Sequence, residues 1–240
     1  MKNILIPSTL ESDTLDAIQF AVQQSKGQQC TIFLTFINEI PDTDSPAAFL
    51  RTMKCELTFS QKEVLSNCWK LMTDSKNCSL KIHNQYGISA PTLKNLIQHL
   101  SIDLTILPLS YKSAEKRIHK QFIQILENCK CPILHLNSKS ENQDYSTAMY
   151  LEQNKSKLQI EDLNTLIPEN FNLKIVSQAK IFKDQNPEDL STILNDVITK
   201  KNINLLIETR KPKKIQLKNK TTTTIQDYGL PVLSLYEELV

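Results

Sequence analysis

Short runs of apolar residues alternate along the chain with longer stretches in which apolar residues recur every three or four positions. The runs predict buried strands and the periodic stretches predict amphipathic helices. Strands that alternate with helices imply crossover connections and a parallel sheet, and almost continuously apolar strands fit a sheet covered on both faces. In the first half the strands are expected at residues 2–7, 30–37, 79–84, 102–108 and 132–136, and the helices at 12–26, 46–74, 90–100 and 114–128.

The second half repeats the end of the first. Pro132–Leu136 (Pro-Ile-Leu-His-Leu) and Pro231–Leu235 (Pro-Val-Leu-Ser-Leu) are similar phrases, and each is preceded by an amphipathic helix and an apolar strand. The repeat predicts two α/β modules, residues 1–138 and 145–240, separated by a polar linker. Further elements of the second module are expected at 147–151, at 158–167, at 173–182 as one long strand or two short ones, and at 203–207. Nothing in it corresponds to the helix at 46–74, so this module is expected to be a shortened version of the first that lacks this helix.

Two helices of the first module allow detailed expectations. Ser12 is a plausible N-cap and Gly27 a plausible C-cap for the first helix. Its apolar stripe is formed by Leu15, Ile18, Ala21 and Val22, with Phe20 off the stripe. In the long helix, Val64, Leu65, Cys68, Leu71 and Met72 share one face, and Trp69 beside that face is expected to pack.

The composition limits the classes of protein to which the chain can belong. The chain has 240 residues, 40% hydrophobic and 22% charged, which is ordinary for a globular protein. A net charge of +2 gives no field that favours nucleic acid or an anionic membrane. No apolar run approaches the roughly 18 residues of a membrane span, and the chain starts in a strand rather than a signal peptide. We therefore expect a cytoplasmic protein that binds neither membrane nor nucleic acid.

The motifs of common enzymes and metal sites are absent from the sequence. The six cysteines include no Cys-x-x-Cys pair and are read as reduced core thiols. No His-Glu-x-x-His and no Gly-x-Ser-x-Gly occurs, which removes the common helix-borne zinc site and the nucleophile elbow. A Cys–His dyad is left open, because such pairs meet only in space. No catalytic residue, no metal and no enzymatic activity are expected.

Glycine is scarce, with only Gly27, Gly87 and Gly229 in the chain. Phosphate-binding loops need closely spaced glycines so that the backbone can approach the phosphate. These three are too far apart to build either a Walker loop or a dinucleotide fingerprint.

Four segments of the first module resemble the universal stress protein family. They are Asn3-Ile4-Leu5-Ile6-Pro7, Gln85-Tyr86-Gly87, Ile102-Asp103-Leu104-Thr105-Ile106-Leu107 and Cys131-Pro132-Ile133-Leu134. The resemblance covers residues 1–137 well and 145–236 through the repeat. It implies a tandem, bacterial-type stress protein of α/β class: two Rossmann-like (adenine nucleotide alpha hydrolase-like) three-layer modules with parallel five-stranded sheets, the second degenerate.

The chain departs from the family at its ATP site. Thr9 stands where ATP-binding members have an aspartate after the first strand. The family's glycine loop aligns with Leu109-Ser110-Tyr111-Lys112 and a short spacer ending near His119-Lys120, and all its glycines are missing. Because Cβ atoms there should block the approach of phosphate, the resemblance implies that the usual ATP motif is lost. No cofactor is expected, with ATP or AMP left open.

Two functional hypotheses are compatible with the sequence. The first is a non-catalytic stress-response or regulatory protein that acts through contacts with an unidentified protein partner. In it, Pro132–Leu136 would pair with Pro231–Leu235 within the chain as a pseudo-dimer, and a homodimer is left open. The alternative is a small-ligand or nucleotide-binding protein with a remodelled pocket. The candidate pocket residues are Thr9, Ile37, Ser110, Lys112, His119 and Lys120. Whether the basic segment Arg210–Lys220 is a solvated loop or binds an anion is also left open.

Overall fold

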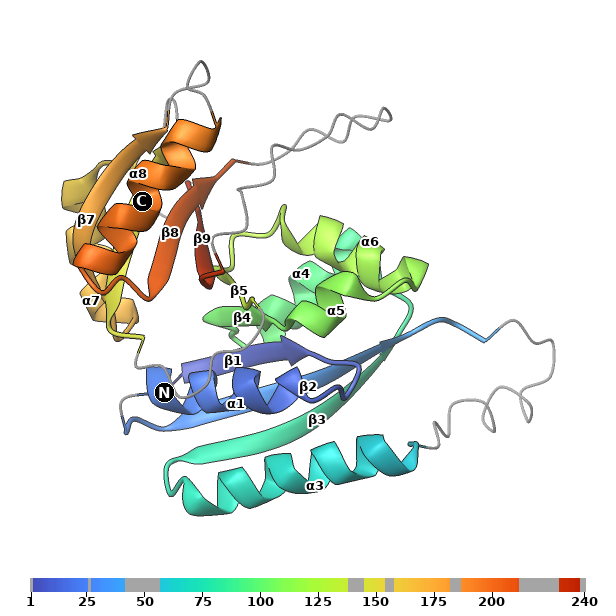
Figure 1. The fold of residues 1–240 in the computed structure, drawn as a ribbon. Coiled ribbons are helices and arrows are strands. Elements are labelled where there is room, and N and C mark those ends of the chain that lie inside the picture. Colours follow the sequence, from blue (N-terminus) through green and yellow to red (C-terminus); the bar gives the residue numbers. More distant parts are fainter. Residues whose placement is uncertain are drawn as a thin grey trace. The chain divides into compact units, whose positions relative to one another are not determined.

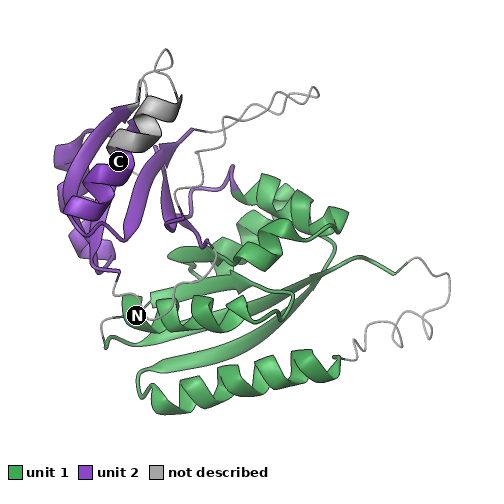
Figure 2. Ribbon diagram, viewed as in Figure 1, with its two compact units in different colours: residues 1–126 green, residues 127–240 purple. Residues whose placement is uncertain are grey.

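The computed structural model describes residues 2–25, 27–41, 57–137, 145–153, 158–181, 187–211 and 229–237. The chain divides into two compact units, Met1–Leu126 and Glu127–Val240 (Figure 2). In the described part of the chain, no helix is long and apolar enough to cross a membrane.

The sheet of the first unit has the strand order β3-β2-β1-β4, and its strands are parallel (Figure 1). Ile4, Leu5 and Ile6 in its central strand have no exposed surface, which fits a sheet covered on both faces. These strands confirm the predicted parallel arrangement. Their bounds are β1 Lys2–Pro7, β2 Cys30–Asn38, β3 Cys78–Tyr86 and β4 Leu104–Leu107.

The helices of the first unit form two groups. α1 packs on β1, β2 and α3, whereas α6 packs on α4, α5 and β2. Side chains cap two of these helices: Ser89 accepts the Thr92 N–H at the start of α4, and Thr58 forms a capping box with Gln61 at the start of α3. The bounds are α1 Asp13–Gln24, α3 Phe59–Asp74, α4 Ala90–His99, α5 Leu109–Ser113 and α6 Arg117–Leu126.

Three details of these helices differ from the expectations. Ser12 lies at the N-cap position of α1, but its side chain makes no capping hydrogen bond. The buried face of α1 includes Phe20, which was placed off the stripe, while Leu15 and Val22 are only half-buried. Trp69 is 44% exposed, so the expected packing of this residue is wrong. The first residues of the helix predicted at 46–74, up to residue 56, lie outside the described residues.

The second unit contains a sheet of order β5-β9-β8-β6-β7. Its strands are parallel except for β5 and β9, which pair antiparallel with Leu134 opposite Leu233. β6 lies between β7 and β8 as β1 lies between β2 and β4 in the first unit, and no equivalent of α3 and β3 occurs among the described residues. The bounds are β5 Ile133–His135, β6 Thr147–Gln153, α7 Ile160–Asn170, β7 Lys174–Ile181, α8 Pro187–Lys200, β8 Leu205–Arg210 and β9 Val232–Tyr236.

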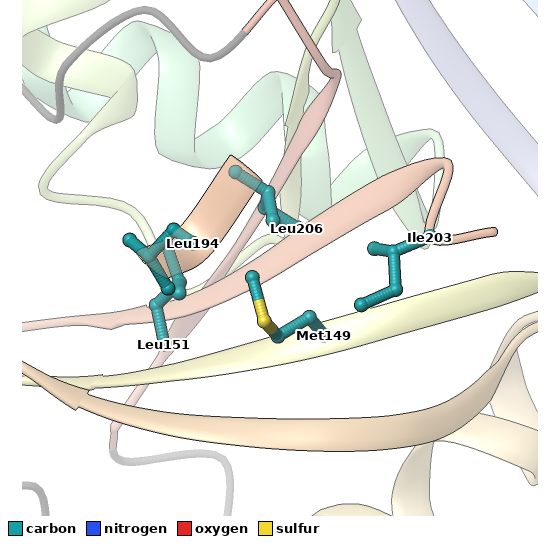
Figure 3. Packing of buried hydrophobic residues seen from close by; sticks show 5 residues of the cluster. All are labelled: Met149, Leu151, Leu194, Ile203 and Leu206. Atoms are coloured by element: carbon teal, nitrogen blue, oxygen red, sulfur yellow. The ribbon is translucent and has the colours of Figure 1, made fainter. Parts of the chain in front are cut away.

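The core of the second unit is a cluster from β6, α8 and β8, together with a residue two positions before β8 (Figure 3). Its members are all at most 4% exposed: Met149, Leu151, Leu194, Ile203 and Leu206. Val176, Val197 and Val232 are partly buried and pack against the cluster. Apolar burial at these positions therefore holds the sheet and α8 of this unit together.

Ile203→Val is expected to lower the free energy of unfolding by about 0.5–1.5 kcal/mol, because it removes one buried methyl group from this cluster. Denaturant unfolding followed by circular dichroism measures the change. Ile40→Val is the matched control, since Ile40 is 65% exposed and its loss of a methyl group should cost less than about 0.5 kcal/mol. Equal effects of the two substitutions would contradict the assignment of Ile203 to the core.

Candidate ligand-binding site at the strand ends of the first unit

The carboxyl ends of parallel strands meet at one edge of a sheet, and this edge is where α/β proteins hold ligands. All the residues proposed for a pocket lie on elements that leave this edge. Thr9 follows β1, Ile37 is near the end of β2, and the rest lie on the two helices that follow β4. Ser110 and Lys112 belong to α5, and His119 and Lys120 belong to α6.

Hydrogen bonds within the chain hold the turn after β1 in place. The Ser8 hydroxyl accepts the Leu10 N–H at 2.8 Å and lies 2.8 Å from the Thr14 hydroxyl. Leu10 has a φ of 61°, a left-handed conformation that is costly for a side chain of this kind, and it is buried. The Thr9 carbonyl accepts the Gln61 side-chain amide at 3.1 Å, while the Thr9 hydroxyl is buried without a partner among the described residues.

The carboxylate of Asp13 accepts hydrogen bonds from the donors at the start of α5. Asp13 Oδ2 accepts the Ser110 N–H at 2.7 Å, and Asp13 Oδ1 accepts the Ser110 hydroxyl at 2.6 Å. Burial, and after it the charge of Asp13, raises the pKa of Asp16 on the same helix above its usual value. A phosphate at Ser110 would have to displace the carboxylate of Asp13.

Aromatic packing fills the space beside this contact. Tyr111 and Phe122 have no exposed surface and His119 is 6% exposed. The Tyr111 ring centroid lies 4.7 Å from that of His119 and 5.8 Å from that of Phe122, the latter edge-on. The backbone of Ile37 lies close enough to the His119 imidazole to act on its pKa. The segment that aligns with a glycine loop is thus built around a buried tyrosine.

The structure brings some predicted pocket residues together and not others. His119 meets Ile37, and Ser110 meets Asp13, which was not among the candidates. Lys112 is half-buried, and Lys120 is exposed on α6. Asp13 and Tyr111 were missed because their contacts span distant parts of the chain. An acidic residue in the first turn of α1 was the only local signal for Asp13.

Stability should fall between pH 7.5 and 5.5 because of His119. Burial lowers the pKa of His119 from its ordinary value of about 6.5, so the unfolded chain binds the proton at a higher pH than the folded chain. The contribution of this histidine is present above the unfolded pKa and is lost as the pH falls toward the folded pKa. His119→Gln cannot titrate, so its unfolding free energy should vary less over this range. Parallel pH profiles of the two proteins would contradict the burial of a neutral imidazole.

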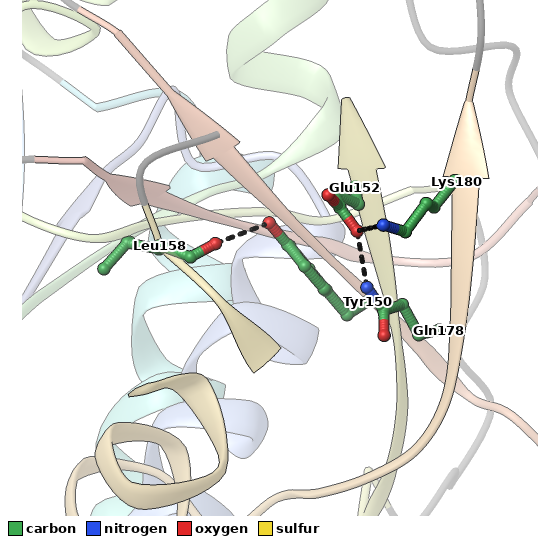
Figure 4. A network of polar contacts seen from close by, with 5 residues as sticks. All are labelled: Tyr150, Glu152, Leu158, Gln178 and Lys180. Carbon is green, nitrogen blue, oxygen red and sulfur yellow. Dashed lines mark hydrogen bonds and ion pairs between the residues drawn. The ribbon is translucent and has the colours of Figure 1, made fainter. Parts of the chain in front are cut away.

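The strand ends of the second unit carry a different set of polar contacts (Figure 4). The Tyr150 hydroxyl donates to the Leu158 carbonyl at 3.4 Å. Glu152 Oε2 accepts the Gln178 amide at 2.5 Å and lies 3.3 Å from the Lys180 ammonium. The Lys180 side chain is 60% exposed, and such exposed ion pairs contribute only about 0–1 kcal/mol. These contacts connect β6 to its neighbours and form no assembled reactive group.

Of the basic segment Arg210–Lys220, the first two residues belong to the described part of the chain. Lys211 lies 3.4 Å from the carboxylate of Glu237, whose other oxygen accepts the Thr209 hydroxyl at 3.2 Å. The Arg210 side chain is bonded to backbone carbonyls of its own unit. Residues 212–220 and the threonine run 221–224 lie outside the described residues.

No family model matches the sequence, and no curated protein is similar to it in sequence. Among solved structures, a universal stress protein from Archaeoglobus fulgidus DSM 4304 matches with a TM-score of 0.58 over 98% of each chain, at 9% identity. The chain has a universal stress protein fold. A functionally unknown protein, PA1789 from Pseudomonas aeruginosa PAO1, matches with a TM-score of 0.55 at 11% identity, over 99% of this chain and 93% of the other.

Both matches extend over the whole chain, so the universal stress protein fold accounts for the described elements of both units. This confirms the fold expected from the four segments and from the repeat. Identities this low show a shared fold and carry no residue roles from one protein to the other.

Proposed function

We propose that this chain is a non-catalytic, cytoplasmic regulatory protein of the universal stress protein type, which acts through protein contacts and does not hold ATP in the family's usual way. The observation that carries the proposal is the contact between Asp13 and Ser110 at the start of α5. Nucleotide phosphates need hydrogen-bond donors there and a favourable charge. The donors of Ser110 are taken, and the charge beside them is negative.

The buried Tyr111 supports the same reading. Its ring and those of His119 and Phe122 take up the volume that follows β4, where a phosphate loop has glycines. Moving Tyr111 out would expose a large apolar side chain, at a cost of roughly 1.5–3 kcal/mol for a buried aromatic of this kind. A nucleotide would have to supply that free energy in addition to its own binding.

The pairing of β5 with β9 supports a role for the chain as an intramolecular pseudo-dimer. These are the two strands that end the repeated phrases, and Ile133, Leu134 and His135 lie opposite Ser234, Leu233 and Val232. Antiparallel pairing satisfies the backbone of both strands and removes two open edges. In the proposal, this arrangement leaves other surfaces of the same chain for a protein partner.

Titration with ATP, AMP and cyclic AMP tests the proposal. We expect no change in melting temperature at millimolar nucleotide, and no release of phosphate from ATP. As a matched comparison, Asp13→Asn keeps the size of the side chain and removes its charge. A saturable rise in melting temperature with wild-type protein would refute the loss of nucleotide binding, and measured turnover would refute the non-catalytic role.

A second candidate is a small-ligand protein with a remodelled pocket at the same strand ends. It is favoured by four buried polar atoms that have no hydrogen-bond partner among the described residues. They are Thr9 Oγ1, Asn38 Nδ2, Tyr111 Oη and His119 Nδ1. Such atoms cost about 1–3 kcal/mol each when unpaired, so a small uncharged polar molecule that satisfied them would gain affinity.

Adenosine, which has no phosphate, is the probe for this alternative. Binding measured by calorimetry should weaken about tenfold in Tyr111→Phe or His119→Gln if these atoms contact the ligand, since each removes about one hydrogen bond. Lys120→Gln is the control, because Lys120 is exposed. Absence of heat with adenosine at millimolar concentration would leave the regulatory proposal in place and discard an adenosine pocket.

A further inference from the structure

Two cysteines of the first unit lie side by side at the amino ends of their strands. Cys30 is the first residue of β2, Cys78 is the first residue of β3, and the two residues are partners in the parallel register of these strands. Neighbouring strands lie about 4.7–4.9 Å apart, and register partners of parallel strands point to the same face of the sheet. The two thiols therefore lie next to each other, at the opposite ends of the strands from the candidate ligand-binding site.

Hydrogen bonds from both strands and from the end of α1 hold this pair of cysteines in place. The Cys30 N–H donates to the carbonyl of Asn77, the residue before Cys78, at 2.9 Å. The Cys78 thiol donates to the Ser25 hydroxyl at 3.7 Å, and this hydroxyl donates to the Val22 carbonyl at 2.7 Å. Both cysteines are free thiols. The first unit thus keeps two reduced sulfurs together in a fixed setting.

The two sulfurs differ in how a reagent can reach them. Cys30 is 2% exposed, whereas Cys78 is half-buried in β3, the strand at the end of the order β3-β2-β1-β4. Burial, and after it the neighbouring Cys78 thiol, raises the pKa of Cys30 to about 12, while the charge of Lys2 acts in the opposite direction. A reagent from solvent therefore meets Cys78 first, and Cys30 is placed to react with the sulfur of Cys78.

We propose that Cys30 and Cys78 form a reversible disulfide when the chain meets a small-molecule disulfide of the glutathione type. The Cys78 thiol loses its proton, and the thiolate attacks one sulfur of glutathione disulfide, whose S–S bond breaks and releases one glutathione thiolate. Cys30 then loses its proton, and its sulfur attacks the Cys78 sulfur of the mixed disulfide, which releases the second glutathione thiolate. Both thiolates take up the protons that the cysteines lost. Two protein thiols are thereby oxidised to one disulfide, and one glutathione disulfide is reduced to two thiols.

The strand geometry predicts that this disulfide is easily reduced. The Cα atoms of a disulfide are about 4.4–6.8 Å apart, a range that includes the spacing of neighbouring strands, so the bond can form while β2 and β3 stay paired. The Cα–Cβ bonds of register partners run side by side, however, whereas a relaxed disulfide brings its Cβ atoms to about 3.8 Å. Formation of the bond therefore strains the start of both strands, and strained disulfides are the labile ones.

Oxidation of this pair changes the amino ends of β2 and β3. It takes the Cys78 thiol away from the Ser25 hydroxyl at the end of α1, and it connects the start of β3 covalently to β2. The reaction does not depend on the proposed loss of nucleotide binding, because the contact between Asp13 and Ser110 lies at the carboxyl ends of the strands.

The test is incubation of the reduced full-length protein with glutathione disulfide, followed by acid quenching, blocking of the free thiols and peptide mass spectrometry. We expect the link between Cys30 and Cys78 to exceed any link of Cys68 to either residue by at least about tenfold, because sulfurs that are held side by side react within one molecule. An excess of reduced glutathione should then remove the link. A Cys30–Cys78 link no more abundant than those of Cys68, or one that resists reduced glutathione, overturns the proposal.

Serine substitutions separate the roles of the two sulfurs. In Cys30→Ser, the mixed disulfide of Cys78 with glutathione should accumulate to at least about tenfold its wild-type level, since the thiol that releases the second glutathione is missing. Cys68→Ser is the matched control, because Cys68 is also buried but lies outside the pair, and it should leave the Cys30–Cys78 link unchanged. Equal amounts of mixed disulfide in Cys30→Ser and in the wild-type protein overturn the proposal. If Cys30→Ser does not fold, the measurement on the wild-type protein decides alone.

Discussion

Tyr111→Ala is expected to lower the free energy of unfolding by about 3–5 kcal/mol, because it leaves a cavity between His119 and Phe122 at the centre of the first unit. The Tyr111 side chain has no exposed surface. Water that entered the cavity would not replace the apolar contacts that the ring makes. Denaturant unfolding followed by circular dichroism measures the change.

Tyr111→Phe is the control that separates packing from hydrogen bonding. The Tyr111 hydroxyl is buried and has no partner among the described residues. Removal of an unpaired buried hydroxyl should be neutral or should stabilise the protein by up to about 1 kcal/mol. A loss of more than about 1 kcal/mol in Tyr111→Phe would show that the hydroxyl is bonded, and would count against a strand end that is closed by packing alone.

Arg210→Met is expected to lower the free energy of unfolding by about 2–4 kcal/mol. It leaves the carbonyls of Glu127, Cys129, Cys131 and Ser234 without their donor, and each unpaired carbonyl costs about 1–3 kcal/mol before it finds water. Relief of the cost of burying the guanidinium offsets part of this loss. Denaturant unfolding gives the total, and hydrogen exchange at the amides of 133–135 shows whether β5 opens first.

Two variants define the limits of the Arg210 effect. Arg210→Lys should lose an intermediate amount, because an ammonium cannot reach four carbonyls from one point as a planar guanidinium does. Lys180→Met removes an exposed ion pair of the same unit and should cost less than about 1 kcal/mol. If Arg210→Met cost no more than Lys180→Met, Arg210 would not hold the segment before β5.

The architecture could be predicted because it depends on local patterns. The apolar run at residues 2–7 is β1, and the run at 102–108 contains β4. The repeated phrases contain β5 and all of β9 except its last residue. A run of apolar residues between turn residues can be buried on both faces only as an interior strand. The lack of an equivalent of α3 in the second half was also visible as a missing periodic segment.

The orientation of single side chains was harder to predict. The stripe chosen for α1 placed Phe20 outside, but Phe20 is 3% exposed and Ala17 is fully buried. A helix that packs on both a sheet and α3 has a wider buried face than one apolar stripe indicates. Trp69 shows the opposite error, since a large aromatic ring near an apolar face is 44% exposed.

The sequence by itself determined the α/β order of elements, the repeat, and the absence of a glycine-built phosphate loop, since each depends on residue types within a few positions of one another. The tertiary structure decided what replaces that loop. Asp13 and Ser110 are 97 residues apart, and Arg210 meets carbonyls about 80 residues away in the sequence. No local pattern encodes such contacts, because they exist only after the strands have placed distant turns at the same edge of a sheet.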